Sequence, residues 1–315
     1  MTIFGMLIFS ILFFQMNILL FILIFAALFY FFSSPVGALS DSLAQRQADI
    51  HMISFGTIRM WGSIGFGLSS LIIGQFLNSY GVEFMMWPYL ILGTLLLVIA
   101  FNIVDAKTST STDTKQVQLK DLKVLFTNKK FIIFLSIMMF ITITHRANDS
   151  FIGLFITSIG GSESLVGIAW FIALISEALI FAFAYYWFKK ERALLFLILA
   201  SVFYTLRWLL FAFTTDPTIV IIGQLLHGLT FGIFYLSALD YVTQLIPKTL
   251  NSSGHLIFYS VFFGISGIIG SLIGGFLLDQ YGGQTLYLVM AGMTLIGTVL
   301  LIIFTSLNQK KPHLN

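Results

Sequence analysis

The sequence predicts an all-α fold, a bundle of helices that crosses a membrane many times. Hydrophobic residues make up 58% of the chain and charged residues only 9%, and mean hydropathy is +0.98. A soluble domain carries about 25% charged residues. The apolar stretches are long and continuous, without the alternation over about ten residues that barrel strands show. Because backbone polar groups must pair internally within lipid, these stretches predict helices.

Polar and Gly/Pro clusters divide the chain into ten candidate spans, the first of them shorter than the roughly 20 residues that cross a bilayer. The expected spans are residues 1–14, 18–39, 56–77, 84–104, 129–157, 164–187, 193–213, 217–245, 254–278 and 285–307. We therefore expect an N-terminal part of four spans in residues 1–104 and a C-terminal part of six spans, with its tail, in residues 129–315.

Residues 105–128 form the longest polar stretch and are expected to be a cytoplasmic linker. The first half of this stretch is rich in Ser and Thr, which is typical of flexible linkers. Its second half contains QLKDLKVLF, which predicts a short amphipathic helix on the membrane surface.

The basic residues predict the orientation of the chain. Of the sixteen Lys and Arg, Arg146 and Arg207 lie within apolar spans. The other fourteen all lie on one side of the predicted membrane: Arg46, Arg59, Lys107, Lys115, Lys120, Lys123, Lys129, Lys130, Lys189, Lys190, Arg192, Lys248, Lys310 and Lys311. The positive-inside rule places this side, and the C-terminus, in the cytoplasm. The basic balance is thus a topology signal in a plasma (inner) membrane protein, and we expect no nucleic-acid partner.

The two parts of the chain resemble each other. Gly74–Gly81 reads GQFLNSYG and Gly275–Gly282 reads GFLLDQYG, at a separation of 201 residues. Transporters commonly consist of two such halves. The repeat predicts an N-terminal half that begins about 72 residues before Met1, which is room for two further helices. A chance match in a sequence of low diversity is the plainer alternative.

Three ionisable residues fall deep within successive spans. Glu177 lies about 18 Å from the cytoplasmic boundary at 1.5 Å per residue, and Arg207 and His227 fall at similar depths. Burial favours the protonated form of a carboxylic acid, whereas a nearby guanidinium favours the ionised form. Movement of Arg207 relative to Glu177 would therefore load or release a proton, and His227 could relay it. A buried network that only holds helices together is the alternative.

Two further polar groups are candidates for binding a solute. Asp41 and Arg59 lie near the cytoplasmic ends of adjacent spans, where an arginine fork could hold hydroxyls or a carboxylate. An interfacial salt bridge would explain them equally well. His145, Arg146, Asn148 and Asp149 cluster in the fifth span, and we expect substrate contact by Asn148 or Asp149, with His145 as a packing residue.

Several stretches across the chain resemble the major facilitator superfamily, in the branch that contains lactose permease and the phenylpropionate-type permeases. They are SSPVGALSDSLA at Ser33–Ala44, FGTIRMWGSIGF at Phe55–Phe66, SEALIFAF at Ser176–Phe183, TLRWLLFA at Thr205–Ala212 and GQLLHGLTFGIF at Gly223–Phe234. The resemblance implies helices three to twelve of a twelve-helix fold, apparently without the first two.

The family's functional residues carry over unevenly. Asp41 matches its helix-four carboxylate and Arg59 its substrate-binding arginine. Glu177, Arg207 and His227 match charged or titratable positions on helices eight, nine and ten. Thr230, by contrast, stands where lactose permease-like proteins have a proton-releasing glutamate.

These observations predict a secondary transporter, a proton symporter of a small organic solute such as an aromatic acid, a sugar or a nucleoside. A truncated, non-transporting fragment is the main alternative. A membrane enzyme is less favoured, because the sequence has no HExxH, GxSxG or Walker motif and no cysteine. Beyond solute, protons and lipid, we expect a monomer without cofactor or metal.

Overall fold

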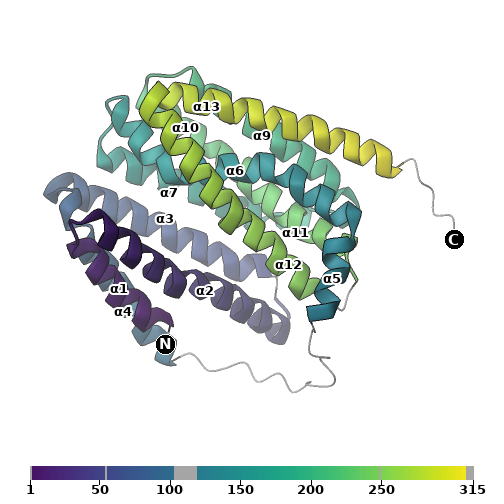
Figure 1. Ribbon diagram of the computed structural model, residues 1–315, viewed down its shortest axis with the longest axis horizontal. Coiled ribbons are helices and arrows are strands. Elements are labelled where there is room, and N and C mark those ends of the chain that lie inside the picture. Colours follow the sequence, from purple (N-terminus) through teal and green to yellow (C-terminus); the bar gives the residue numbers. More distant parts are fainter. Residues whose placement is uncertain (1, 54, 103–118, 248–249, 310–315) are drawn as a thin grey trace.

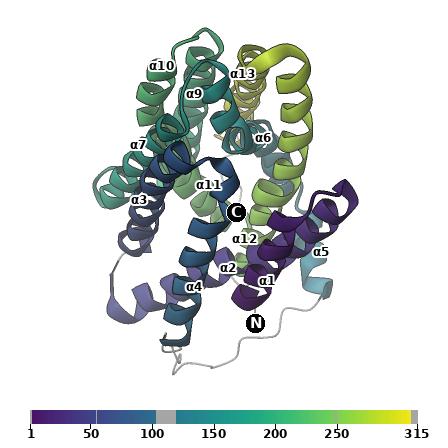
Figure 2. The ribbon, with the colours of Figure 1, turned by 90° about the vertical axis from the view of Figure 1, so that its left-hand side faces the viewer.

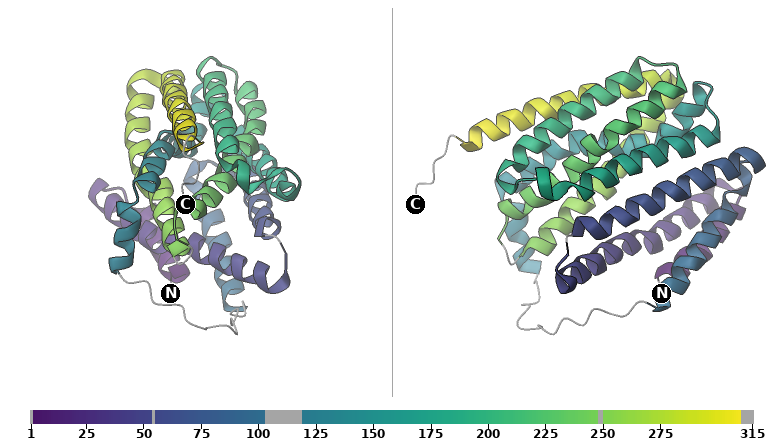
Figure 3. Two further views of the ribbon diagram at one scale, coloured as in Figure 1. Left: turned by 90° about the vertical axis from the view of Figure 1, so that its right-hand side faces the viewer. Right: turned by 180° about the vertical axis from the view of Figure 1, so that it is seen from behind.

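The computed structural model describes residues 2–53, 55–102, 119–247 and 250–309, and every regular element in these ranges is a helix (Figure 1). The N-terminal helices gather on one side of the molecule and the C-terminal helices on the other (Figure 3). The all-α, multi-pass fold predicted from composition is confirmed. Residues 103–118, most of the expected linker, lie outside the described ranges.

The first four predicted spans correspond to α1 (Thr2–Gln15), α2 (Leu19–His51), α3 (Phe55–Tyr80), and η1 (Val82–Phe84) with α4 (Met86–Asn102). α2 runs twelve residues beyond its expected end at residue 39. From Ala38 onward polar residues are interspersed with Ala and Leu, which are good helix formers, so the helix continues after the apolar run stops. It ends at His51, and the left-handed backbone of the capping residue Met52 (φ 55°) lets the Ile53 N–H bond the Ala48 carbonyl at 3.0 Å.

The C-terminal part begins with α5 (Leu119–Thr127), the short helix predicted at the end of the linker. Asn128 caps the next helix by accepting a hydrogen bond from the Phe131 N–H, and its amide donates to the Leu245 carbonyl at 2.8 Å. The remaining elements are α6 (Lys129–Ser158), α7 (Glu163–Ala182), α8 (Ala184–Trp187), η2 (Lys190–Arg192), α9 (Ala193–Ala212), α10 (Pro217–Gly223), η3 (Gln224–Leu226), η4 (Gly228–Gly232), α11 (Ile233–Leu245), α12 (Asn251–Tyr259), η6 (Ser260–Ile265) and α13 (Ser266–Gln309).

The described helices account for the ten expected spans. Eight helical stretches are long and apolar enough to cross a membrane, and α1 is a shorter apolar helix. The last stretch, Ser253–Asn308, turns back on itself at Gly282, where φ is 82° and ψ is 170°. A backbone with positive φ favours glycine. Figure 1 shows the two arms diverging from this turn, one along the top of the view and the other down toward α12.

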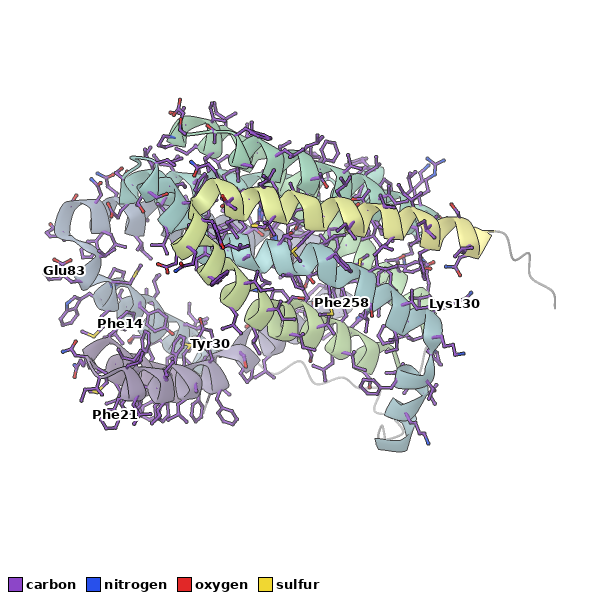
Figure 4. The ribbon with its side chains drawn as sticks, turned by 45° about the horizontal axis from the view of Figure 1, so that its top comes forward. Phe14, Phe21, Tyr30, Glu83, Lys130 and Phe258 are labelled. Atoms are coloured by element: carbon purple, nitrogen blue, oxygen red, sulfur yellow. The ribbon has the colours of Figure 1, made fainter. Side chains whose placement is uncertain are left out.

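The surface of the bundle is apolar, as contact with lipid requires. Phe14, Phe21 and Tyr30 on α1 and α2 are exposed and point outward, whereas Phe258 is buried (Figure 4). Glu83 and Lys130 lie toward opposite ends of the molecule in the same view. This arrangement agrees with the expected topology, although the orientation of the chain in the membrane stays a prediction.

The two parts of the chain meet along α3 and α7, which lie side by side (Figures 1 and 2). Where the end of α3 meets the start of α7 the backbones touch: a Cβ on Gly74 would lie 2.7 Å from the Cα of Gly167 and 3.0 Å from the Glu163 carbonyl oxygen. Phe66 packs against Trp170 further along, with ring centroids 5.8 Å apart. This seam brings one face of α3 against the polar interior of the C-terminal part.

Candidate functional site

The carboxylate of Glu177 on α7 is buried and is approached from both parts of the chain. Ser63 on α3 donates a hydrogen bond to Oε1 at 2.8 Å, and Nη2 of Arg59 lies 3.9 Å from the same oxygen. Nε2 of His227 lies 3.3 Å from Oε2. Arg59 and Ser63 are four residues apart, which places them on one face of α3. The site is thus an acid held by a hydroxyl, a guanidinium and an imidazole.

His227 lies between Glu177 and Arg207. Nη1 of Arg207 is 3.2 Å from Nδ1 of His227. A guanidinium can only donate hydrogen bonds, so Nδ1 is the acceptor and the neutral ring carries its proton on Nε2. That proton faces Glu177. The sequence predicted that Arg207 would act on Glu177 directly, whereas the structure places the imidazole between them.

Arg207 on α9 is fully buried, and its charge is distributed over several partners. Its guanidinium donates to Thr230 Oγ1 at 3.1 Å and to Gln224 Oε1, and it lies 5.0 Å from the ring centroid of Trp208. A buried arginine requires such partners because an unpaired charge is very costly to bury. Thr230, the position at which the resemblance seen in the sequence implied a departure from its family, is thus a hydrogen-bond partner of the arginine.

The backbone around His227 departs from α-helical geometry. η3 is a 3₁₀ turn and η4 is a π-helix, and π-helical segments often occur at functional sites. Ser176 on α7 bonds the backbone on both sides of His227. Its hydroxyl donates to the Leu225 carbonyl at 2.6 Å and accepts from the Gly228 N–H at 3.1 Å. Only glycine fits at residue 228, because a Cβ there would lie 2.4 Å from the Ser176 carbonyl oxygen.

Replacement of Ser176 by Ala should loosen the irregular segment that carries His227. The variant loses both hydrogen bonds, each worth about 1 kcal/mol, so the imidazole is held less firmly against Glu177. We expect a shift in the pH profile of transport with little change in protein yield. Ser136→Ala, which removes a hydroxyl bonded only within α6, is the control. An unchanged profile in both variants would contradict this positioning role.

The polar residues on α6 have two kinds of partner: Asn148 bonds a neighbouring helix, whereas Asp149 pairs with Arg146 and His145. Asn148 is buried and its amide oxygen accepts from the Tyr287 hydroxyl at 3.1 Å. Asp149 accepts from Nη1 of Arg146 at 2.8 Å, and Nε2 of His145 lies 3.5 Å from the same carboxylate oxygen. Substrate contact by Asn148 or Asp149 stays a prediction. Asp41 lies in α2, and its side chain is outside the described part of the structure.

Several residues of the site were not singled out in the sequence. Ser63 lies one helical turn after Arg59, and Gln224 lies one turn before His227. Helical spacing from a charged or titratable residue would have identified both. Tyr204, whose hydroxyl lies 2.9 Å from Nδ1 of His145, was one aromatic among many. Within the described ranges, His, Asp and Glu form no group that could hold a metal ion.

Acidic, basic and imidazole groups gathered inside a multi-pass bundle are typical of membrane transporters, because ionisable residues at membrane depth mark transport pathways and proton relays. The chain belongs to the family described as the MFS_1 like family, which matches residues 1–289. The resemblance seen in the sequence is thereby confirmed.

Similar proteins from bacteria agree with this family. An uncharacterized transporter of Bacillus subtilis (strain 168), YwbF, is 28% identical, over 94% of this chain and 73% of its own length. A maltose permease of Geobacillus stearothermophilus is 26% identical, over 86% and 68%. The probable 3-phenylpropionic acid transporter of Escherichia coli (strain K12) is also 26% identical, over 84% and 69%.

The fold has a close counterpart among solved structures. The crystal structure of the nucleoside transporter NupG superposes with a TM-score of 0.78 at 19% sequence identity, over 98% of this chain and 82% of that one. At this identity the likeness concerns the fold alone.

Proposed function

We propose that the protein is a secondary active transporter that couples proton movement to the transport of a small organic solute by alternating access. The observation that carries the proposal is the environment of Glu177, a buried acid that Arg59 and Ser63 reach from α3 and His227 reaches from the C-terminal part. One titratable group thus touches both parts of the chain that alternating access moves relative to each other.

Protonation of Glu177 would change what Arg59 can bind. The ionised carboxylate attracts the guanidinium, whereas the neutral acid does so only weakly. Arg59 is then available for a solute carboxylate or hydroxyl, to which it can offer two parallel N–H donors. Its Nε is buried without a hydrogen-bond partner, although its side chain is 28% exposed. Proton binding would therefore favour solute binding and weaken the contact between α3 and α7.

His227 and Arg207 would complete the proton-coupling group. The Nε2 proton of His227 faces Glu177, so the neutral imidazole can donate a hydrogen bond that stabilises the ionised acid. Arg207 keeps that tautomer in place by donating to Nδ1. Asp41, on α2, is proposed as the second member of a substrate clamp with Arg59.

An aromatic carboxylic acid is the solute class we propose first. A guanidinium recognises a carboxylate with two hydrogen bonds, and a similar protein carries the name of a 3-phenylpropionic acid transporter. Sugars and nucleosides are the competing classes, since other similar proteins are named as maltose, sucrose and xanthosine permeases.

Uptake into proteoliposomes tests the proposal. The purified protein is reconstituted, an inward proton gradient is imposed, and radiolabelled 3-phenylpropionate, maltose, sucrose and xanthosine are compared. We expect accumulation of one of these solutes that collapses when a protonophore removes the gradient. Accumulation that persists without the gradient would contradict proton coupling. Solute-free vesicles report proton leak, and vesicles without protein report passive entry of the acid.

A further inference from the structure

The α6 cluster repeats, with different residues, the arrangement found around Glu177. Oδ2 of Asp149 accepts from Nη1 of Arg146 at 2.8 Å, and Nε2 of His145 lies 3.5 Å from that oxygen. Nδ1 of His145 is engaged by the Tyr204 hydroxyl at 2.9 Å. Both groups therefore consist of a carboxylate that faces an imidazole Nε2 and a partly exposed arginine.

The two histidines are close neighbours inside the bundle. Their ring centroids are 5.8 Å apart, and Phe231 of the π-helix packs against both. The Phe231 ring is stacked on His145 at 4.7 Å with an interplanar angle of 8°. Phe231 is mostly buried, so this contact holds the His145 ring in the plane that points its Nε2 toward Asp149.

The two carboxylate oxygens of Asp149 differ in their hydrogen bonding. Arg146 and His145 both approach Oδ2, whereas Oδ1 is buried and has no hydrogen-bond partner. An ionised carboxylate with an unsatisfied buried oxygen is costly, and a proton on that oxygen removes the charge. The side chains of Asp149 and Arg146 are 18% and 30% exposed, so the group has an edge from which a proton can arrive.

We propose that Asp149 and His145 form a second proton-binding site, separate from Glu177 and His227. The site extends the proposed proton-coupled function, because a transporter with two such acids can carry or store a second proton in each cycle. Asp149 binds the proton on Oδ1 while Arg146 remains on Oδ2. The other titratable or charged groups that face this site from neighbouring helices are Tyr204, Arg207, His227, Glu177 and Tyr287.

Infrared difference spectroscopy of the purified full chain tests the proposal without knowledge of the solute. Spectra recorded at low and high pH show protonated carboxylic acids by their carbonyl stretch. We expect one titrating band that disappears in Asp149→Asn and a second that disappears in Glu177→Gln. Asp279→Asn, which removes an exposed acid on α13 whose side chain bonds only its neighbour Gln280, should leave both bands in place.

Two further measurements keep the test decisive if Asp149→Asn does not fold. Asp149→Glu retains an acid and should keep a titrating band at a shifted frequency. In the unmutated chain, ¹³C at the aspartate carboxyls should move the first band and leave the Glu177 band unmoved. If the only aspartate bands that titrate are those of exposed acids, the proposal is overturned. Asp149 would then be a permanent ion-pair partner of Arg146. If the unmutated chain instead shows a titrating aspartate band but no titrating Glu177 band, that result would count against the proposed function.

Discussion

Replacement of Glu177 by Gln should abolish uptake driven by an imposed pH gradient. The amide resembles the protonated acid in shape and charge but cannot release a proton. Its oxygen can still accept from Nε2 of His227 while its NH2 group donates to the Ser63 hydroxyl, so the bundle should stay intact. We expect initial rates of gradient-driven uptake to fall about a hundredfold or more, in line with the loss of an acid–base group. Solute exchange at equal concentrations on both sides should survive, because it requires no proton release.

The matched control for this variant lies on the same helix. Glu163→Gln removes an acid from the first turn of α7, about 21 Å away along the helix at 1.5 Å per residue. We expect near-normal uptake from it. Gradient-driven uptake by Glu177→Gln at the rate of the unmutated protein would show that Glu177 does not carry the coupled proton. A loss of exchange as well as uptake would point to solute binding rather than to coupling.

Replacement of Gly74 by Val should hold the end of α3 away from the start of α7. A Cβ there would meet backbone atoms, the Cα of Gly167 at 2.7 Å and the Glu163 carbonyl oxygen at 3.0 Å, and backbone cannot rotate away. Overpacking of this kind costs about 1–3 kcal/mol, which shifts an equilibrium between conformations by about 5-fold to 150-fold. Uptake should therefore fall roughly tenfold, because the cycle needs the conformation in which this seam is closed.

The chain offers a clean way to observe that seam. It contains no cysteine, so Leu174→Cys, at a buried position on α7 beside α3, introduces a single thiol. Its labelling by a maleimide should be faster when Gly74→Val is also present. Gly65→Val is the control, since a Cβ at residue 65 of the same helix meets nothing within 4 Å. Equal labelling rates in the Gly74 and Gly65 variants would mean that the contact does not govern opening.

The sequence predicted the elements well because the membrane imposes simple rules on them. Long apolar runs must become helices, and the places where the runs stop marked nearly every span, including the hairpin at Gly282. The exception was α2, whose helix continues through the polar residues up to His51. Hydropathy reports where lipid ends, whereas a helix ends where its backbone geometry changes, here at Met52.

The sequence by itself also placed Glu177, Arg207 and His227 at membrane depth, because position along a span sets depth at 1.5 Å per residue. Depth does not say which helices are neighbours or how each is rotated about its axis. The tertiary structure decided that Arg59 reaches Glu177 across the α3–α7 seam, that His227 lies between the acid and Arg207, and that the Asn148 oxygen bonds Tyr287. These contacts depend on close packing of small residues such as Gly74 and Gly167 and on the π-helical turn after His227. Both are properties of helices packed against each other, and no single helix specifies them.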